Sequence, residues 1–145
     1  RMEEERENDV DIFLLMNIEN NDENIGALMR LANQFVHVST KEGFGLVVTE
    51  ALWQGTPVIG SNVGGIPQQV VDNKTGFLVE PFDVEKIKQH MKYLLLHPDE
   101  GEILGKQAIE HVREHFLITS LLEKYLLLMR HYNGIDKNQP WFKIG

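Results

Sequence analysis

Short apolar runs rich in β-branched residues alternate with segments of helical periodicity along most of this chain, and this alternation restricts its fold more than any other feature. The runs that predict strands lie at residues 10–16, 35–38, 56–60 and 77–79. Helical spacing lies between them at residues 25–32, 46–54 and 68–71, and a polar break is expected at 17–24. Strands separated by helices are typical of a parallel sheet covered on both faces. We therefore predict an α/β fold.

The last third of the chain has helical patterns only. Helices are expected at residues 84–96, 100–115 and 119–132, with breaks at 97–99 and 116–118. The last of these helices has an apolar stripe made of Leu121, Leu122, Tyr125, Leu126 and Met129. A stripe of this kind usually packs against a core, and we expect it to do so here. Residues 134–145 are expected to form a tail, with Trp141 and Phe142 exposed unless they dock elsewhere.

The glycine-containing turn after the strand at 35–38 is the most informative segment for function. Glu42 and Glu50 bracket Gly43 and Gly45 there, where a strand end meets a helix start. Open parallel sheets bind ligands at this edge. A helix start holds phosphate on its unpaired amides, and carboxylates accept hydrogen bonds from hydroxyls. A nucleotide sugar has both kinds of group, so we predict a ligand whose phosphates lie over the amides of residues 45–47.

Two alternatives stay open for these residues, and two others fail. Glu42 could be a solvated loop charge, and Glu50 an ordinary polar residue on a helix surface. A dinucleotide site needs G-x-G-x-x-G, but Gly43-Phe44-Gly45 is followed by Leu-Val-Val. No Gly-Lys-Ser/Thr element follows a strand either, so a Walker-type phosphate loop is not predicted.

The histidines give no strong functional signal. His111 and His115 have the i, i+4 spacing of a metal pair, but no third ligand completes a set, so no metal site is predicted. His37 lies near the end of the predicted strand at 35–38, just before the glycine turn. Packing is the favoured interpretation of His37, with a minor role beside the ligand left open.

Several spaced motifs carry a resemblance to a known family. Residues 42–51 (EGFGLVVTEA), 55–60 (GTPVIG), 64–66 (GGI) and 75–79 (TGFLV) together resemble the retaining glycosyltransferases of family four, whose signature is Glu-x7-Glu. The resemblance covers roughly residues 9 to 133. Within the family, residues 49–53 and 64–69 are similar to the trehalose synthase and trehalose phosphorylase branch.

The resemblance implies a fold and a set of roles. Family members have two Rossmann-like domains facing across a cleft, and the C-terminal domain holds the nucleotide-sugar donor. Residues 1–133 resemble part of that domain, with 134–145 as a tail, so a Rossmann-like parallel sheet flanked by helices and ending in a helical segment is expected. Glu42 would be the catalytic residue that bonds donor-sugar hydroxyls, and Glu50 would hold the ribose. The implied donor-binding set is Glu42, Gly43, Phe44, Gly45, Leu46, Val47 and Glu50.

The resemblance also implies which ligand the chain would bind and which parts of the family's active site it lacks. The donor would be UDP-, ADP- or GDP-glucose, with no cofactor and no metal. The family's diphosphate-binding Arg and Lys lie upstream, and Arg1, Arg6 and Arg30 do not match them. The N-terminal acceptor domain is missing too, so we expect no turnover from this chain alone. The rival hypothesis is a non-catalytic binding or interaction module that docks a partner through its helical face or its tail.

Composition excludes some other classes of function. The chain has 14 basic and 22 acidic residues, a formal charge of −8 and no basic cluster, so nucleic acid is not an expected partner. The absence of cysteine fits a reducing cytoplasm. No apolar run reaches the roughly 20 residues that span a bilayer. Strands missing before residue 10 would leave an open sheet edge, so a homo-oligomer is a further hypothesis.

Overall fold

The computed structural model describes Phe13 and residues 20–132. Apart from Phe13, the predicted strand at 10–16 lies outside the described residues, as does the predicted tail with Trp141 and Phe142. The described elements are, in chain order, α2 (Asn21–Leu31), β1 (Phe35–His37), α3 (Leu46–Trp53), β2 (Val58–Ser61), α4 (Ile66–Gln69), β3 (Gly76–Val79), α5 (Val84–Leu96), α6 (Pro98–His115) and α7 (Ile118–Tyr132).

The described strands form a three-stranded parallel sheet in the order β1-β2-β3. Phe35 pairs with Val58, and Ile59 pairs with Phe77. All four residues of the central strand β2 are buried, as expected for a strand covered on both faces. The predicted α/β fold with a parallel sheet is therefore confirmed.

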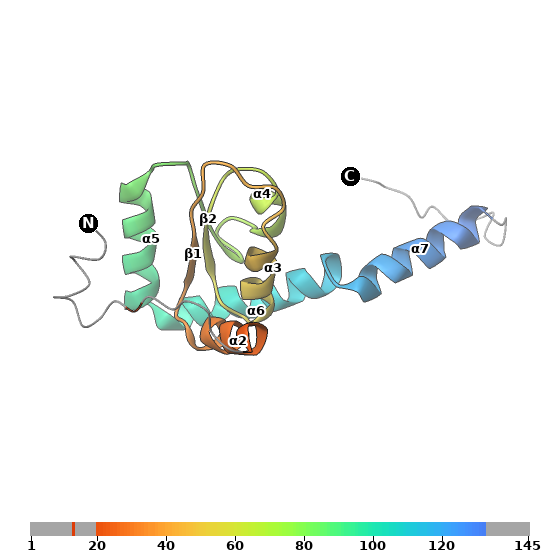
Figure 1. Ribbon diagram of the computed structural model, residues 1–145, viewed down its shortest axis with the longest axis horizontal. Coiled ribbons are helices and arrows are strands. Elements are labelled where there is room, and N and C mark those ends of the chain that lie inside the picture. The colour runs from red at the N-terminus through yellow and green to blue at the C-terminus, as the bar shows by residue number, and fades with distance from the viewer. Residues whose placement is uncertain (1–12, 14–19, 133–145) are drawn as a thin grey trace.

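Helices cover both faces of this sheet (Figure 1). Successive β2 side chains point to opposite faces, so Val58 and Ile59 enter different apolar clusters. The cluster around Val58 contains residues from α2, α3 and α6, and the cluster around Ile59 contains Leu94 from α5. Helix α6 contributes to both clusters, through Ala108 to the first and Leu104 to the second. This long helix therefore ties the two layers together.

Two glycines allow α6 to approach the end of α3 closely. Gly55 has φ 81°, the left-handed conformation expected where α3 ends. A Cβ atom on Gly105 would lie 2.0 Å from the Gly55 carbonyl oxygen, so only glycine fits there. This packing fixes α3, and with it the turn that precedes α3.

Four helix starts differ from their predicted positions. Helix α6 begins at Pro98 rather than at residue 100, and α7 begins at Ile118 rather than at residue 119. Helix α2 begins at Asn21, within the stretch 17–24 that was predicted to be a polar break. The first turn of a helix accepts polar residues, because its amides lack partners within the helix. Helix α4 begins at Ile66 rather than at residue 68, with Pro67 in its first turn, where proline is well tolerated.

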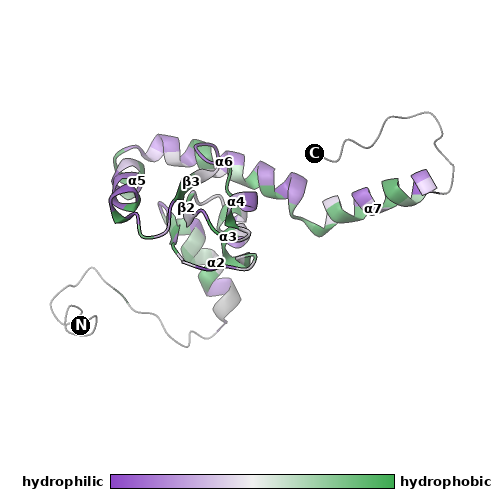
Figure 2. Cartoon of the chain, turned by 90° about the horizontal axis from the view of Figure 1, so that it is seen from above, coloured by the Kyte–Doolittle hydropathy of each residue, from purple (hydrophilic) through white to green (hydrophobic). Residues whose placement is uncertain are grey.

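The prediction that the apolar stripe of α7 packs in a core is wrong for the residues described. No residue of α7 is buried, and Leu122 and Tyr125 are 57% and 59% exposed. Figure 2 shows α7 extending away from the sheet with apolar residues along its length. Periodicity revealed an apolar face but not what lies against it.

None of the helices described is long and apolar enough to cross a membrane.

Candidate functional site

The glycine turn lies between β1 and α3, at the carboxyl edge of the parallel sheet. Helix α3 begins at Leu46 as predicted, and Gly45 before it has φ 80°. No side chain caps this helix start. The Leu46 and Val47 amides are therefore donors without a partner within α3, since the first residues of any helix lack one.

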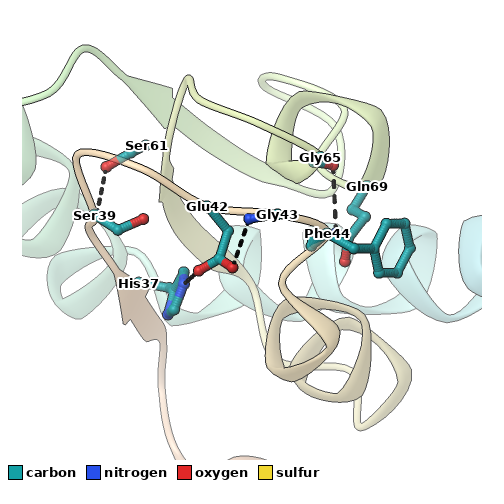
Figure 3. A network of polar contacts seen from close by, with 8 residues as sticks. All are labelled: His37, Ser39, Glu42, Gly43, Phe44, Ser61, Gly65 and Gln69. Carbon is teal, nitrogen blue, oxygen red and sulfur yellow. Dashed lines mark hydrogen bonds and ion pairs between the residues drawn. The ribbon is translucent and has the colours of Figure 1, made fainter.

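The Glu42 carboxylate is held by one hydrogen bond on each oxygen (Figure 3). The Gly43 backbone N–H donates to Oε1 at 3.0 Å, and His37 Nε2 lies 2.9 Å from Oε2. A carboxylate only accepts hydrogen bonds, so His37 must carry a proton on Nε2. The His37 hydrogen bond and then the Gly43 hydrogen bond lower the pKa of Glu42 below its ordinary value, against the opposing effect of burial. Glu42 is consequently an anion at neutral pH.

These two bonds leave the Glu42 carboxylate able to accept more. A carboxylate offers about four lone-pair sites, so roughly two remain for a ligand hydroxyl. The side chains of His37 and Glu42 are 24% and 25% exposed, which leaves the pair accessible from solvent. The site can therefore bind a hydroxylated ligand without first breaking either contact.

The loop between β2 and α4 supports the turn from one side. The Gly65 N–H donates to the Gly43 carbonyl oxygen at 2.7 Å. Gly64 has φ 56°, and a Cβ atom there would lie 1.9 Å from the Glu42 carbonyl oxygen. Gly43 itself has nothing within 4 Å of its own Cβ position. The turn is thus packed against backbone at Gly64 and open at Gly43, where a ligand could approach closely.

Gln69 joins three segments around the turn. Its side chain is fully buried, and its amide nitrogen donates to the Phe44 carbonyl oxygen and to that of Gly65. Its amide oxygen accepts a hydrogen bond from the Thr49 hydroxyl on α3. One side chain therefore connects the turn, α3 and the start of α4. Figure 3 shows Gln69 beside Phe44 and Gly65.

The predicted residues lie in one continuous segment of the chain. Residues 42–47 form the turn and the start of α3, and Glu50 follows in the same helix. Leu46 is 69% exposed and Glu50 is also exposed, whereas Val47 packs partly against the core. Four residues along a helix rise by about 6 Å, so Glu50 lies roughly one turn beyond Leu46. A ligand that contacts both acids would have to extend along the helix start.

Sequence reasoning missed three features of this site. The sequence motifs contain Gly64, Gly65 and Gln69 but do not indicate that these residues support the glycine turn. Packing was favoured for His37; the structure shows the ring stacked on Phe35 and also bonded to Glu42. The paired glycines were a signal of close backbone approach, but only the fold shows which segment approaches.

Other features of the described chain lie away from the turn. A hollow of about 710 Å³ lies between residues 71–75 and α6, and neither Glu42 nor Glu50 lines it. Its lining mixes Lys74 and Lys106 with Glu110 and Glu114, so no single charge dominates. Burial lowers the pKa of His111, whose ring lies 4.8 Å from that of His115. No group of three His, Cys, Asp or Glu residues that could hold a metal occurs in the described part of the chain.

A family model and a curated relative both match most of this chain and indicate the same family. The family model described as "Glycosyl transferases group 1" matches residues 2–111. Trehalose synthase of Thermococcus litoralis is 43% identical over 125 residues, which is 86% of this chain and 30% of that protein. The chain therefore spans about a third of the length of the curated relatives it matches.

Solved structures agree on the fold. Sucrose-phosphate synthase from Thermosynechococcus elongatus has a TM-score of 0.68 and 34% identity, over 78% of this chain and 28% of that one. The C-terminal domain of the group 1 glycosyl transferase LpcC from Francisella tularensis has a TM-score of 0.64 and 25% identity, over 73% and 53% of the two chains. Anabaena HepE in complex with UDP-glucose has a TM-score of 0.65 and 21% identity, over 74% and 30%.

Proposed function

Because this chain belongs to the glycosyl transferases group 1 family, we propose that it is the part of a hexosyltransferase that binds the nucleotide-sugar donor. The observation that carries this proposal is the Glu42 carboxylate, held beside the uncapped start of α3 at the carboxyl edge of the sheet. This arrangement offers hydrogen-bond acceptors for hydroxyls next to donors for phosphate. A nucleoside diphosphate sugar has both groups at adjacent positions.

The proposed binding mode assigns one ligand group to each part of the site. The diphosphate lies over the Leu46 and Val47 amides, with Gly43, Phe44 and Gly45 forming the wall of the turn. Glu42 accepts hydrogen bonds from hydroxyls of the donor sugar and is the candidate catalytic residue. Glu50, exposed one turn farther along α3, accepts those of the ribose. The open space at Gly43 allows the sugar to approach the backbone.

The proposed chemistry is stabilisation of the leaving group. In hexosyl transfer the bond between sugar C1 and the phosphate oxygen breaks, and its electron pair stays on the diphosphate. The oxygen of the acceptor hydroxyl bonds to C1, and its proton passes to the departing diphosphate. Fixed amide donors aimed at the diphosphate lower this barrier, because they need no reorganisation as charge develops. No metal or cofactor is assigned a role.

Two comparisons support the donor and the product class. The identity with trehalose synthase makes glucose transfer with trehalose as product the favoured specific case. HepE, which shares the fold, was solved in complex with UDP-glucose. The part of LpcC that shares the fold is its C-terminal domain. UDP-, ADP- and GDP-glucose are all candidate donors, and a cytoplasmic location stays a prediction. Turnover would also need an acceptor domain and upstream basic residues, so we propose that residues 1–145 alone are inactive.

Calorimetric titration with the three glucose nucleotides tests the proposal. Wild type should bind at least one of them, and Glu42→Ala and Glu50→Ala should each bind it more weakly, by about threefold to tenfold for a lost hydrogen bond. Glu102→Ala is the matched control, because Glu102 is an exposed acid on α6 outside the site. Absence of binding, or equal binding by all four proteins, would refute the donor site.

A second candidate function is a protein-interaction module, which the exposed apolar stripe of α7 favours. In this case the chain would self-associate or capture a partner without binding nucleotide sugar. Light scattering on residues 1–145 would test self-association, and residues 1–133, which keep α7, would show whether the predicted tail is needed for it. A monomer in both cases would count against a homo-oligomer.

A further inference from the structure

His37 makes the contact that ties the Glu42 side chain to the sheet. The other contact, from the Gly43 N–H, comes from the neighbouring residue of the same turn and moves with it. His37 belongs to β1, so its Nε2 fixes the carboxylate relative to the strand layer. The two side chains point toward each other across the start of the turn (Figure 3).

His37 is itself held in place from two directions. Its backbone pairs with Gly60 in the central strand β2, which is fully buried. Its ring is stacked on Phe35, with centroids 6.2 Å apart and planes 7° apart. Both the neutral ring protonated on Nε2 and the doubly protonated ring can donate to Glu42. An N–H donor on Nε2 is therefore present in both of these forms of the ring.

We propose that His37 is a positioning residue that orients the Glu42 carboxylate for the hydroxyls of the donor sugar. This inference rests on the proposed function. A free glutamate side chain samples several rotamers and loses that freedom when a ligand binds. A carboxylate already fixed by His37 avoids this cost, so the bound geometry is prepared before the ligand arrives.

A purely stabilising role does not account for this contact well. Glu42 and His37 are each about one quarter exposed, and ion pairs in contact with solvent add little to the stability of a fold. The ring already packs on Phe35 without using Nε2. The hydrogen bond therefore affects the orientation of Glu42 more than the free energy of unfolding.

Three variants separate the ring from the donor. His37→Phe keeps an aromatic ring to stack on Phe35 but has no N–H group. His37→Gln lacks the ring but carries an amide N–H at a reach similar to that of Nε2. Glu42→Ala removes the acceptor and reports whether the ligand uses this site at all. Urea unfolding of each variant shows whether it folds.

The readouts are the affinity for UDP-, ADP- and GDP-glucose and the titration of the Glu42 side-chain carboxyl, both followed by NMR on the full 145-residue chain. His37→Phe should bind the preferred ligand about threefold to tenfold more weakly, the effect of one hydrogen bond, and His37→Gln should stay within about threefold of wild type. The pKa of Glu42 should rise toward its ordinary value in His37→Phe and less so in His37→Gln.

Different outcomes overturn different statements. If wild type binds and Glu42→Ala binds weakly, but His37→Phe matches wild type in affinity and in the Glu42 titration, the positioning role is refuted and the proposed function stands. If wild type binds none of the three ligands, the proposed function fails, and the role of His37 fails with it. Equal losses in His37→Phe and His37→Gln would show that an N–H donor alone does not restore binding, which also refutes the inference.

Discussion

The substitution Gly64→Ala should damage both the fold and the site, because the new methyl group has no room. Its Cβ would lie 1.9 Å from the Glu42 carbonyl oxygen and 2.9 Å from that of Gly43. Both obstacles are backbone atoms, which cannot rotate away as a side chain can. Gly64 also has φ 56°, a left-handed conformation that costs an alanine about 1–2 kcal/mol.

The expected loss of stability is about 2–3 kcal/mol. The left-handed backbone accounts for about 1–2 kcal/mol, and displacement of the turn adds about 1 kcal/mol through the hydrogen bond between Gly65 and Gly43. Gly43→Ala is the control, because its Cβ would meet nothing within 4 Å and its φ is not positive. We expect this control to stay within about 1 kcal/mol of wild type.

Urea denaturation measures both effects. For a slope of about 2 kcal/mol per molar urea, a loss of about 2–3 kcal/mol lowers the midpoint by about 1–1.5 M. Glucose-nucleotide binding by Gly64→Ala should also fall in dilute buffer, where the variant is still mostly folded. Equal midpoints for Gly64→Ala and Gly43→Ala would refute the argument that backbone packing at Gly64 holds the turn.

Three other variants test single residues. Gln69→Leu keeps the buried volume but leaves the Phe44 carbonyl without its side-chain donor, and urea unfolding should show a loss of about 1–2 kcal/mol. Because the fold lowers the pKa of Glu42, the ionised side chain stabilises the fold at pH values above its ordinary pKa, and this stabilisation is lost as pH falls through the lowered pKa. In Glu42→Gln the corresponding decrease of unfolding free energy with falling pH should disappear. Urea midpoints measured at pH 3 to 6 would show this. Gly105→Ala should lower the melting temperature by several degrees, because its Cβ would lie 2.0 Å from the Gly55 carbonyl oxygen; an unchanged value would contradict the close approach of α6.

Most helices and strands could be predicted from the sequence, because the residues that start, stop and pattern each element lie within it or next to it. Helix α5 spans Val84–Leu96 as predicted, since Asp83 accepts a hydrogen bond from the Lys86 N–H at its start and Pro98 follows its end. The start of α3 at Leu46 follows from the glycine before it in the same way. Contacts between distant segments were not predictable in this way. Nothing near Gln69 in the sequence indicates that its amide reaches Phe44, 25 residues away.

The stripe on α7 shows the same limit from the other side. Periodicity correctly predicted a helix with one apolar face, because that pattern is a property of the segment alone. Burial depends on a second surface, and no described element supplies one for α7. The prediction that this face packs in a core therefore assumed a second surface, and the pattern contains no information about one.

The position of Glu42 depends on contacts from three segments of the fold. His37 in β1 holds its carboxylate, Gly64 after β2 packs against its carbonyl oxygen, and Gln69 in α4 holds the adjacent turn. The acid reaches its observed position only when β1, β2 and α4 are assembled, so the site forms together with the sheet. A variant that loses binding therefore identifies a ligand contact only if its unfolding free energy is unchanged. Of these three supports, His37 is the one whose replacement should weaken binding more than it weakens the fold, because its bond to Glu42 is partly exposed to solvent.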